Sequence, residues 1–501
     1  MNTPPIQATI LIILVPLMFS YAIPLLGWRW RGSAFFVALA AIGASMVCSF
    51  ILLYTVLTQG TIHYHLGGWL PPWGIEYVID PLNGFMGVVV CVLSFLVTLS
   101  SRVSVEKELP DKKVRFYTLY LLLFTGLMGI LVTGDVFNLY VFLEIASLTA
   151  YALIAIGEDG APLAAFNYII MGTIGACFYL LGVGYLYIMT GSLNIADLAK
   201  LLPALHQSNV ILIALAFFLI GTAIKMGLFP LHVWLPDAYT YAPSAVSSFI
   251  APLMTKVMAY ILIRVLFSVF QPSYVFQTLP IGVILSWLGA AAILIGSIFA
   301  IVQVDLKRML AYSSVANIGF IVLGIGLANK LGFIGGFFHI LNHAFMKATL
   351  FLVAAGIMYK MGMRNIYQFR GLRRKMPLTM TAFTIAALSM VGVPPTAGFF
   401  SKVYLILGAI QARQWFFIAV ILISSLLNAV YFFKVIEMAF FKPGEAKPGG
   451  NTSQEEKIGM DEMPWSMLIP TLVIAVGILL LGIFNGRIIS SVLELAVPPG
   501  F

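Results

Sequence analysis

The sequence predicts an all-α polytopic membrane protein of about fourteen transmembrane helices, with two inverted five-helix repeats and broken helices seven and twelve. Of the 501 residues, 61% are hydrophobic and 9% are charged, whereas soluble domains have roughly 45–50% and about 25%. A chain with so few charges cannot cover a soluble surface. This excludes a soluble enzyme, a disordered scaffold and a nucleic-acid binder.

Fourteen apolar stretches are long enough to cross a bilayer, which takes about 20 residues per helix. They are 6–27, 33–57, 79–101, 114–133, 135–156, 163–190, 209–229, 243–270, 279–302, 309–328, 332–359, 377–410, 414–441 and 465–489. We divide the chain into three N-terminal helices, two half-channel repeats, and a polar loop with a last helix. These parts are 1–113, 114–270, 271–441 and 442–501.

The loop charges test this count. If the loops alternate between two sides, eighteen Lys and Arg fall on one side and five on the other. Lys447 and Lys457, in the polar loop, belong to the larger group. The positive-inside rule makes that side cytoplasmic. We therefore expect an integral protein of a prokaryotic cytoplasmic membrane with both termini on the outer side.

Five cations remain inside the predicted spans. They are Lys225, Lys256, Lys347, Lys402 and Lys434, and Glu144 and Glu437 are carboxylates at similar depth. Each buried charge costs about 2.5–3.5 kcal/mol on insertion scales, so intramembrane charges indicate function.

Two spans contain prolines that should open the helix. In GTAIKMGLFPLHVWLPDAY, Lys225 precedes a break at Pro230, and we expect a second break at Pro236. In SMVGVPPTAGFFSKVY, two consecutive prolines precede Lys402. Open backbone at membrane depth requires neighbouring protein or a water-filled cavity. Each broken helix is the fourth of its five-helix unit, which is typical of inverted-repeat transporters.

Glu144, deep in the fifth span, needs a cationic partner to stay charged. Lys225 is the candidate, because it is the next ionisable residue within a span. One interpretation is a static ion pair that fixes helix packing. The other is a switch, in which separating the pair favours release of the lysine proton and re-forming it favours recapture.

The eleventh span carries His339, His343 and Lys347 at i, i+4 and i+8, which places them on one helix face. Histidine exchanges protons near neutral pH, so this face favours a proton relay, with Lys256 of the eighth span as a further member. A metal site is a competing interpretation, although no HExxH pattern or adjacent carboxylate accompanies the pair. Packing histidines are another.

Four further residues are weaker candidates for proton transfer. Lys434 and Glu437, at i and i+3, are at least as well explained by a local ion pair. Asp237 lies at a cavity mouth or caps a helix, and Asp135 is a candidate N-cap of the fifth span.

The sequence predicts no cofactor and no metal. It has no P-loop, no Rossmann fingerprint, and no ligand set for haem or iron–sulfur clusters. Cys48, Cys91 and Cys177 lie far apart in apolar runs, which indicates neither a metal site nor disulfides. Protons are the expected cargo, and exchange against Na⁺ or K⁺ stays open.

Five segments together resemble the antiporter-like subunits shared by respiratory complex I and multisubunit Mrp-type cation/proton antiporters. They are GDVFNLYVFLE, KMGLFPLHVWLPDAY, PSAVSSFIAPLMTKV, DLKRMLAYSSVANIG and GVPPTAGFFSK. The resemblance implies fourteen helices with two inverted half-channels. YLYIMTGSLNIADL and the surroundings of Lys402 are most similar to the D-type subunits of Mrp antiporters, whereas HILNHAFMKATLF is shared with complex I and membrane-bound hydrogenase relatives. Where the most similar complex I subunit usually bears a glutamate in helix twelve, this sequence has Lys402.

The resemblance implies a proton-translocating subunit of an Mrp-type Na⁺/H⁺ antiporter, working with other hydrophobic subunits. We expect Glu144 and Lys225 to form the switch, and Lys402 to gate the second half-channel. The first alternative is a subunit of a redox-driven complex, either an NADH:quinone oxidoreductase or a membrane-bound hydrogenase. The second alternative is a membrane scaffold that transports nothing, in which the buried charges are replaceable without loss.

Overall fold

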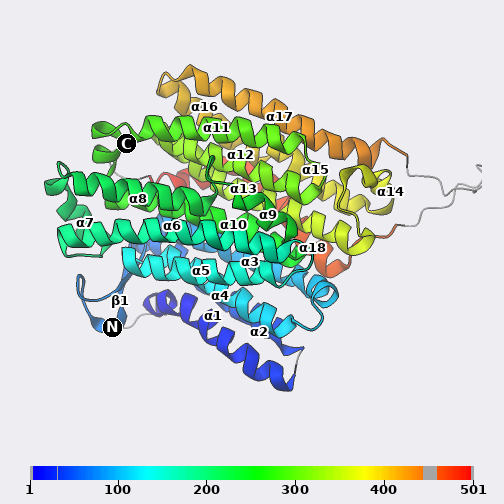
Figure 1. The fold of residues 1–501 in the computed structure, drawn as a ribbon, viewed down its shortest axis with the longest axis horizontal. Coiled ribbons are helices and arrows are strands. Elements are labelled where there is room, and N and C mark those ends of the chain that lie inside the picture. Colours follow the sequence, from blue (N-terminus) through cyan, green and yellow to red (C-terminus); the bar gives the residue numbers. More distant parts are fainter. Residues whose placement is uncertain (1–3, 31, 444–459, 498–501) are drawn as a thin grey trace, which may run out of the picture.

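The chain folds into a bundle of helices that run side by side (Figure 1). The computed structural model describes residues 4–30, 32–443 and 460–497. Two of the loop cations, Lys447 and Lys457, lie outside the described residues. Both marked ends of the chain lie at one end of the bundle, and α14 (Leu372–Lys375) lies at the other.

Thirteen of the described helices are long and apolar enough to cross a membrane. They are α1 (Pro4–Arg29), α2 (Ser33–Gln59), α3 (Pro81–Glu108), α4 (Lys113–Val132), α5 (Val136–Ala155), α6 (Ala161–Thr190), α8 (Asn209–Met226), α10 (Ser244–Ile263), α11 (Ile281–Ile301), α12 (Leu306–Gly326), α13 (Lys330–Met361), α17 (Trp415–Phe440) and α18 (Trp465–Ile483). The remaining predicted span consists of two shorter apolar helices, α15 (Pro377–Val391) and α16 (Ala397–Gln411). The polytopic all-α prediction is confirmed.

Short elements connect the long helices. Besides α14, they include α7 (Ile195–Leu201), α9 (Trp234–Tyr241), α19 (Asn485–Ile488), and the strands β1 (Ile62–His65) and β2 (Glu76–Ile79). The strands pair antiparallel in a hairpin that the sequence pattern did not predict. Glu76 is buried in this hairpin. Its carboxylate contacts His63 Nδ1 at 2.6 Å and accepts a hydrogen bond from Asn194.

One capping arrangement occurs in both predicted repeats. Asp135 before α5 and Asp305 before α12 each accept a hydrogen bond from the backbone N–H three residues later. Each also forms an isolated β-bridge to an asparagine that follows the next long helix, Asp135 to Asn194 and Asp305 to Asn365. The same cap and bridge thus occur at the second helix of 114–270 and at the second helix of 271–441.

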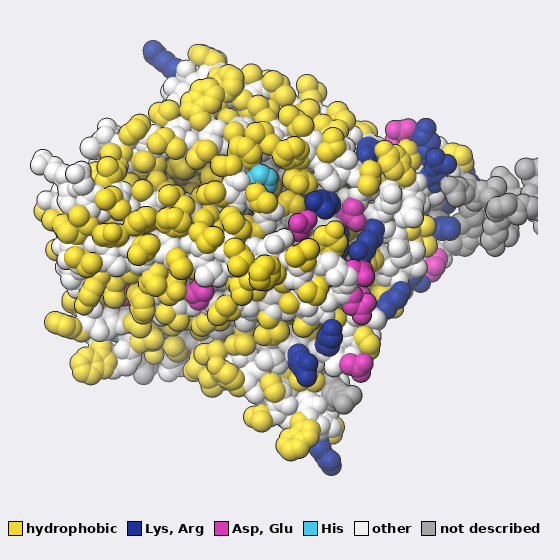
Figure 2. All heavy atoms as spheres, in the orientation of Figure 1, with side chains coloured by type: hydrophobic (Ala, Val, Ile, Leu, Met, Phe, Trp, Pro, Cys, Tyr) yellow, Lys and Arg dark blue, Asp and Glu magenta, His cyan; other side chains and the backbone are white. Residues whose placement is uncertain are grey.

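Charged side chains gather toward one end on the face that Figure 2 shows. On the face in Figure 2, most Lys and Arg lie toward the end that carries α14, and hydrophobic side chains cover the middle. Both marked chain ends lie at the opposite end (Figure 1). This distribution agrees with a bilayer around the middle and with the predicted charge asymmetry.

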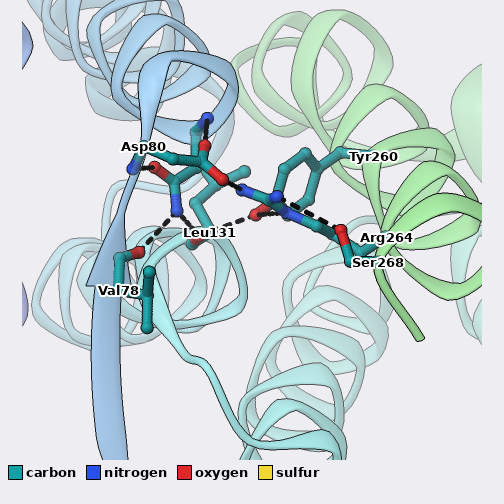
Figure 3. A network of polar contacts seen from close by, with 7 residues as sticks. Val78, Asp80, Leu131, Tyr260, Arg264 and Ser268 are labelled. Atoms are coloured by element: carbon teal, nitrogen blue, oxygen red, sulfur yellow. Dashed lines mark hydrogen bonds and ion pairs between the residues drawn. The ribbon is translucent and has the colours of Figure 1, made fainter. Parts of the chain in front are cut away.

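An ion pair and the hydrogen bonds around it connect α3, α4 and α10 (Figure 3). Arg264, which continues α10 in a short π-helix (Arg264–Val269), contacts the Asp80 carboxylate at 2.6 Å. Its Nε donates to the Tyr260 hydroxyl at 2.7 Å, and Tyr260 donates to the Leu131 carbonyl of α4 at 2.9 Å. Asn83, in the first turn of α3, donates to the same carbonyl. Arg264 is one of the five Lys and Arg that the loop-charge count assigns to the less charged side.

Replacing Arg264 with alanine should lower the free energy of unfolding by about 3 kcal/mol, because it leaves Asp80 without its cation in a largely buried place. The matched control is Glu494→Gln at the exposed pair of Lys330 and Glu494, where about 0–1 kcal/mol is expected. Unfolding of the purified complex by a denaturing detergent measures both. Equal effects of the two variants would contradict the importance of the buried pair.

Candidate proton pathway

The first broken helix opens beside Lys225. Helix α8 ends at Met226, where Gly227 adopts a positive φ of 72°, and α9 begins at Trp234. Pro230 lies in the irregular segment, as expected. The predicted second break at Pro236 is wrong. Pro236 lies in the first turn of α9, where a helix needs no backbone donor and proline is tolerated.

The second break separates α15 from α16, and Lys402 of α16 reaches across it. Its Nζ donates to the carbonyls of Met390 and Val391 at 3.0 and 2.9 Å, and to the Ser425 hydroxyl of α17 at 2.9 Å. Those carbonyls end α15, where the helix dipole favours a cation. The structure therefore explains how Lys402 is held at this depth without a carboxylate.

Glu144 and Lys225 form the predicted pair, with 3.1 Å between Lys225 Nζ and Glu144 Oε1. The lysine is buried with 1% of its side chain exposed, whereas Glu144 retains 24% exposure. Lys225 Nζ also donates to Ser147 at 2.7 Å and to Tyr151 at 3.5 Å. Because all three partners lie on α5, the ammonium has alternative acceptors along one helix if it leaves Glu144.

His339 has hydrogen bonds at both ring nitrogens. Its Nε2 lies 3.0 Å from Asn317 Oδ1 and its Nδ1 lies 2.9 Å from Ser401 Oγ. The amide of Asn317 donates to the Ser313 carbonyl, so its oxygen accepts and the neutral ring is assigned a proton on Nε2. When Nδ1 takes a proton, the Ser401 hydroxyl can turn to the Gly398 carbonyl at 3.0 Å. The ring can thus be protonated without leaving a donor unpaired.

Replacing Ser401 with alanine should slow proton transport about tenfold. It removes the acceptor of the protonated ring, and a hydrogen bond to a charged group contributes about 1.5–3 kcal/mol. Ser401→Thr keeps the hydroxyl and should retain most of the rate. Ser297→Ala, at the Ser297–Ser424 hydroxyl pair between α11 and α17, is the control. Proton flux into vesicles containing the assembled complex measures all three. An unchanged rate in Ser401→Ala would exclude this role of Ser401.

The next group of buried residues joins α10 to α13. Lys256 Nζ donates to the Ala251 carbonyl at 2.6 Å, and Lys347 Nζ donates to the Leu310 carbonyl at 2.6 Å. Lys256 lies near enough to His339, His343 and Lys347 to interact with them electrostatically. The structure therefore brings these four sequence-predicted residues together.

His343 has no hydrogen-bond partner at either nitrogen among the described residues, although it is fully buried. Its ring stacks on that of His339, with centroids 5.9 Å apart. Buried polar groups without protein partners are commonly satisfied by internal water. An internal water beside the His343 ring would satisfy these nitrogens.

The accessory candidates have other partners. The predicted local pair of Lys434 and Glu437 is wrong, because Lys434 donates to the Gln303 carbonyl at 3.2 Å and Glu437 pairs with Lys442 at 3.1 Å. A spacing of i and i+3 permits a contact on a helix but does not require one, and here each side chain has another partner. Asp237 pairs with Arg308 at 3.3 Å. Asp135 is an N-cap.

His232 is a candidate that the sequence pattern did not single out. It lies in the irregular segment between α8 and α9 with 7% exposure. No partner reaches its Nδ1 within the described parts of the chain. The sequence contained a signal for it, because this histidine lies between the two prolines of the seventh span. No group of three or more His, Cys, Asp or Glu among the described residues could hold a metal ion.

Comparisons with known proteins agree with this architecture. Residues 133–428 match the family described as "NADH:quinone oxidoreductase/Mrp antiporter, TM". The chain is 49% identical over 497 residues to the N-type subunit of NADH-quinone oxidoreductase from Desulforudis audaxviator, covering 98% of each chain. It is 33% identical over 416 residues to the D-type subunit of the Na(+)/H(+) antiporter from Alkalihalophilus pseudofirmus, covering 81% of each.

The fold is also similar to a chain in the structure of the Mrp complex from Dietzia sp. DQ12-45-1b. The TM-score is 0.88 at 26% identity, covering 99% of this chain and 97% of the other. The sequence analysis favoured a D-type Mrp subunit, but these comparisons do not favour that assignment over a complex I subunit. Relatives of both kinds match this chain over most of their length, and the chain belongs to the NADH:quinone oxidoreductase/Mrp antiporter family of membrane subunits.

Proposed function

We propose that this chain translocates protons across the membrane as one subunit of a multisubunit complex. The observation that carries the proposal is the series of ionisable residues, all of them buried except the partly exposed Glu144, that runs from α5 through α8, α10 and α13 to α16. In this proposal Glu144 and Lys225 act as the switch, and Lys256, His339, His343 and Lys347 conduct protons laterally. Lys402 then controls exchange with the second half-channel.

The identity of 49% over nearly the whole length favours a redox-driven complex of the NADH:quinone oxidoreductase type as the parent assembly. The Mrp-type Na⁺/H⁺ antiporter is the second candidate, supported by 33% identity to the D-type antiporter subunit. Affinity purification of the tagged chain in a mild detergent distinguishes them. Copurifying iron–sulfur subunits support the first candidate, whereas small hydrophobic subunits with Na⁺-dependent proton exchange support the second.

Proton translocation itself is tested on the purified complex in sealed vesicles that contain a pH-sensitive dye. Internal pH should change when quinone reduction is started, or when a Na⁺ gradient is applied. A complex that contains this chain and moves no protons under either driving force would refute the proposal.

We propose that both termini face the outer side of the cytoplasmic membrane, because the cations gather at the opposite end of the bundle. A periplasmic alkaline phosphatase fused after the last residue should be active. The same enzyme inserted in the α14 region should be inactive. The reverse result would invert the proposed orientation.

A further inference from the structure

The series of ionisable residues has one gap, between Lys225 and Lys256. Lys225 Nζ has its contacts on α5, and Lys256 Nζ has its contacts on α10. Buried tyrosines of α5, α6 and α9 lie near this gap: Tyr151 contacts Lys225, Tyr168 contacts Met254, and Tyr239 lies beside Thr255. We propose that the hydroxyl groups of Tyr151, Tyr168 and Tyr239, with intervening water, form the proton link between Lys225 and Lys256. This inference rests on the proposed function.

The link begins at Tyr151, whose hydroxyl lies 3.5 Å from Lys225 Nζ. Helix α6 leaves room for this hydroxyl at Gly172. A Cβ atom at that position would overlap the Tyr151 oxygen, so the glycine is what permits the close approach. Tyr151 then meets Tyr168 of α6 edge to face, with ring centroids 4.5 Å apart.

The position of the Tyr168 side chain is fixed mainly by stacking of its ring, because its hydroxyl makes only a weak hydrogen bond. The ring stacks on Trp234 of α9, with centroids 3.8 Å apart, and Trp234 is fixed by a hydrogen bond to the Ile224 carbonyl. The hydroxyl donates to the sulfur of Met254 at 3.3 Å, and a thioether is a weak acceptor. The hydroxyl proton is therefore easily diverted to a better acceptor.

Tyr239 of α9 lies at the far end of the link. Its hydroxyl is fully buried and reaches no hydrogen-bond partner among the residues that the structure describes. Its polar neighbour is Thr255, whose hydroxyl accepts from Lys256 Nζ at 3.3 Å. Tyr168 lies near enough to both Tyr151 and Tyr239 to interact electrostatically. A buried hydroxyl without a partner at this point is what an internal water would satisfy.

The transfer needs no change at carbon. The Lys225 ammonium gives a proton to the oxygen of Tyr151 while the Tyr151 hydroxyl proton moves on, and the same exchange is repeated at each hydroxyl or water. The neutral amine of Lys256 takes the last proton. Lys225 ends as an amine, Lys256 as an ammonium, and each tyrosine ends neutral with its hydroxyl turned back.

The test uses Tyr168→Phe and Tyr239→Phe, which remove a hydroxyl and keep the ring, and Gly172→Ala, which displaces the Tyr151 hydroxyl. Each should slow proton transport by the complex in vesicles about tenfold. The ratio of rates in H₂O and D₂O should rise, because proton transfer becomes rate-limiting. The double tyrosine variant should be little slower than either single variant, since the groups act in series.

Tyr179→Phe is the matched control, because Tyr179 is also buried on α6 but its hydroxyl donates to a backbone carbonyl. It should transport at the wild-type rate. Wild-type rates and isotope ratios in both Tyr168→Phe and Tyr239→Phe would overturn the inference, as would an equal loss in Tyr179→Phe. If the tyrosine variants transport at the wild-type rate but Lys225→Arg does not transport, the inference fails and the proposed function stands. Full transport in Lys225→Arg would refute the switch itself.

Discussion

Replacing Lys225 with arginine should abolish proton transport while the complex still assembles. Arginine keeps a cation beside Glu144, but its guanidinium is not deprotonated in proteins and cannot release a proton. Loss of a group that must exchange a proton commonly costs about a hundredfold or more in rate. The measurement is proton flux into vesicles containing the purified complex, with native gel electrophoresis to verify assembly.

This substitution separates the two interpretations of the Glu144–Lys225 pair. A static pair that only fixes helix packing is preserved by arginine, so full transport in Lys225→Arg would support packing and exclude the switch. Lys225→Ala should also abolish transport, but it leaves Glu144 without its one ion-pair partner among the described residues and so tests assembly as well. Lys330→Ala, at an exposed pair, is the control and should leave transport unchanged.

The helical architecture and both broken helices were predictable from the sequence, because each depends on local information. Apolar stretches of membrane length identify the spans, and proline identifies the breaks. Pairing of Glu144 with Lys225 was also predictable, since a buried carboxylate requires a cation and few were available. The outcome at Pro236 shows the limit of the proline argument, which depends on where the next helix begins.

The polar partners of the buried residues were not predictable. Ser401 contacts one ring nitrogen of His339, and Asn317 contacts the other. Each contact joins two separate helices, so it depends on how those helices cross. Serine and asparagine are common in membrane helices, so nothing in the sequence distinguishes these two. Lys434 illustrates the same point, because its partner, the Gln303 carbonyl, is 131 residues away in the chain.

The tyrosines between Lys225 and Lys256 carry no signal of their own in the sequence. Tyr151, Tyr168 and Tyr239 look like ordinary aromatic residues of apolar helices. Only the packing of α5 against α6 brings the rings of Tyr151 and Tyr168 together, and only the structure shows that the Tyr239 hydroxyl of α9 lacks a partner among the described residues. Function along such a path depends on burial and on the hydroxyl orientation, neither of which is a local property.

Replacing Lys402 with alanine should reduce proton transport about a hundredfold or more, and should also destabilise the second break. The Met390 carbonyl keeps a donor in Asn428, but the Val391 carbonyl loses its charged donor, and an unsatisfied buried acceptor costs about 1–3 kcal/mol. Lys402→Arg separates the two effects. It keeps a cation at the end of α15, so thermal stability of the complex should recover, but transport should stay blocked because arginine retains its proton.

Ser425→Ala is the control for this site, because it removes one of three acceptors and leaves the ammonium on the carbonyls of α15. Its transport rate should fall no more than a few-fold. If Lys402→Arg transported protons at the wild-type rate, Lys402 would be a cap of α15 and not a proton-exchanging group. The second half-channel would then need another titratable residue, and His339 is the first candidate, because it interacts electrostatically with Lys402 and can be protonated without losing a partner.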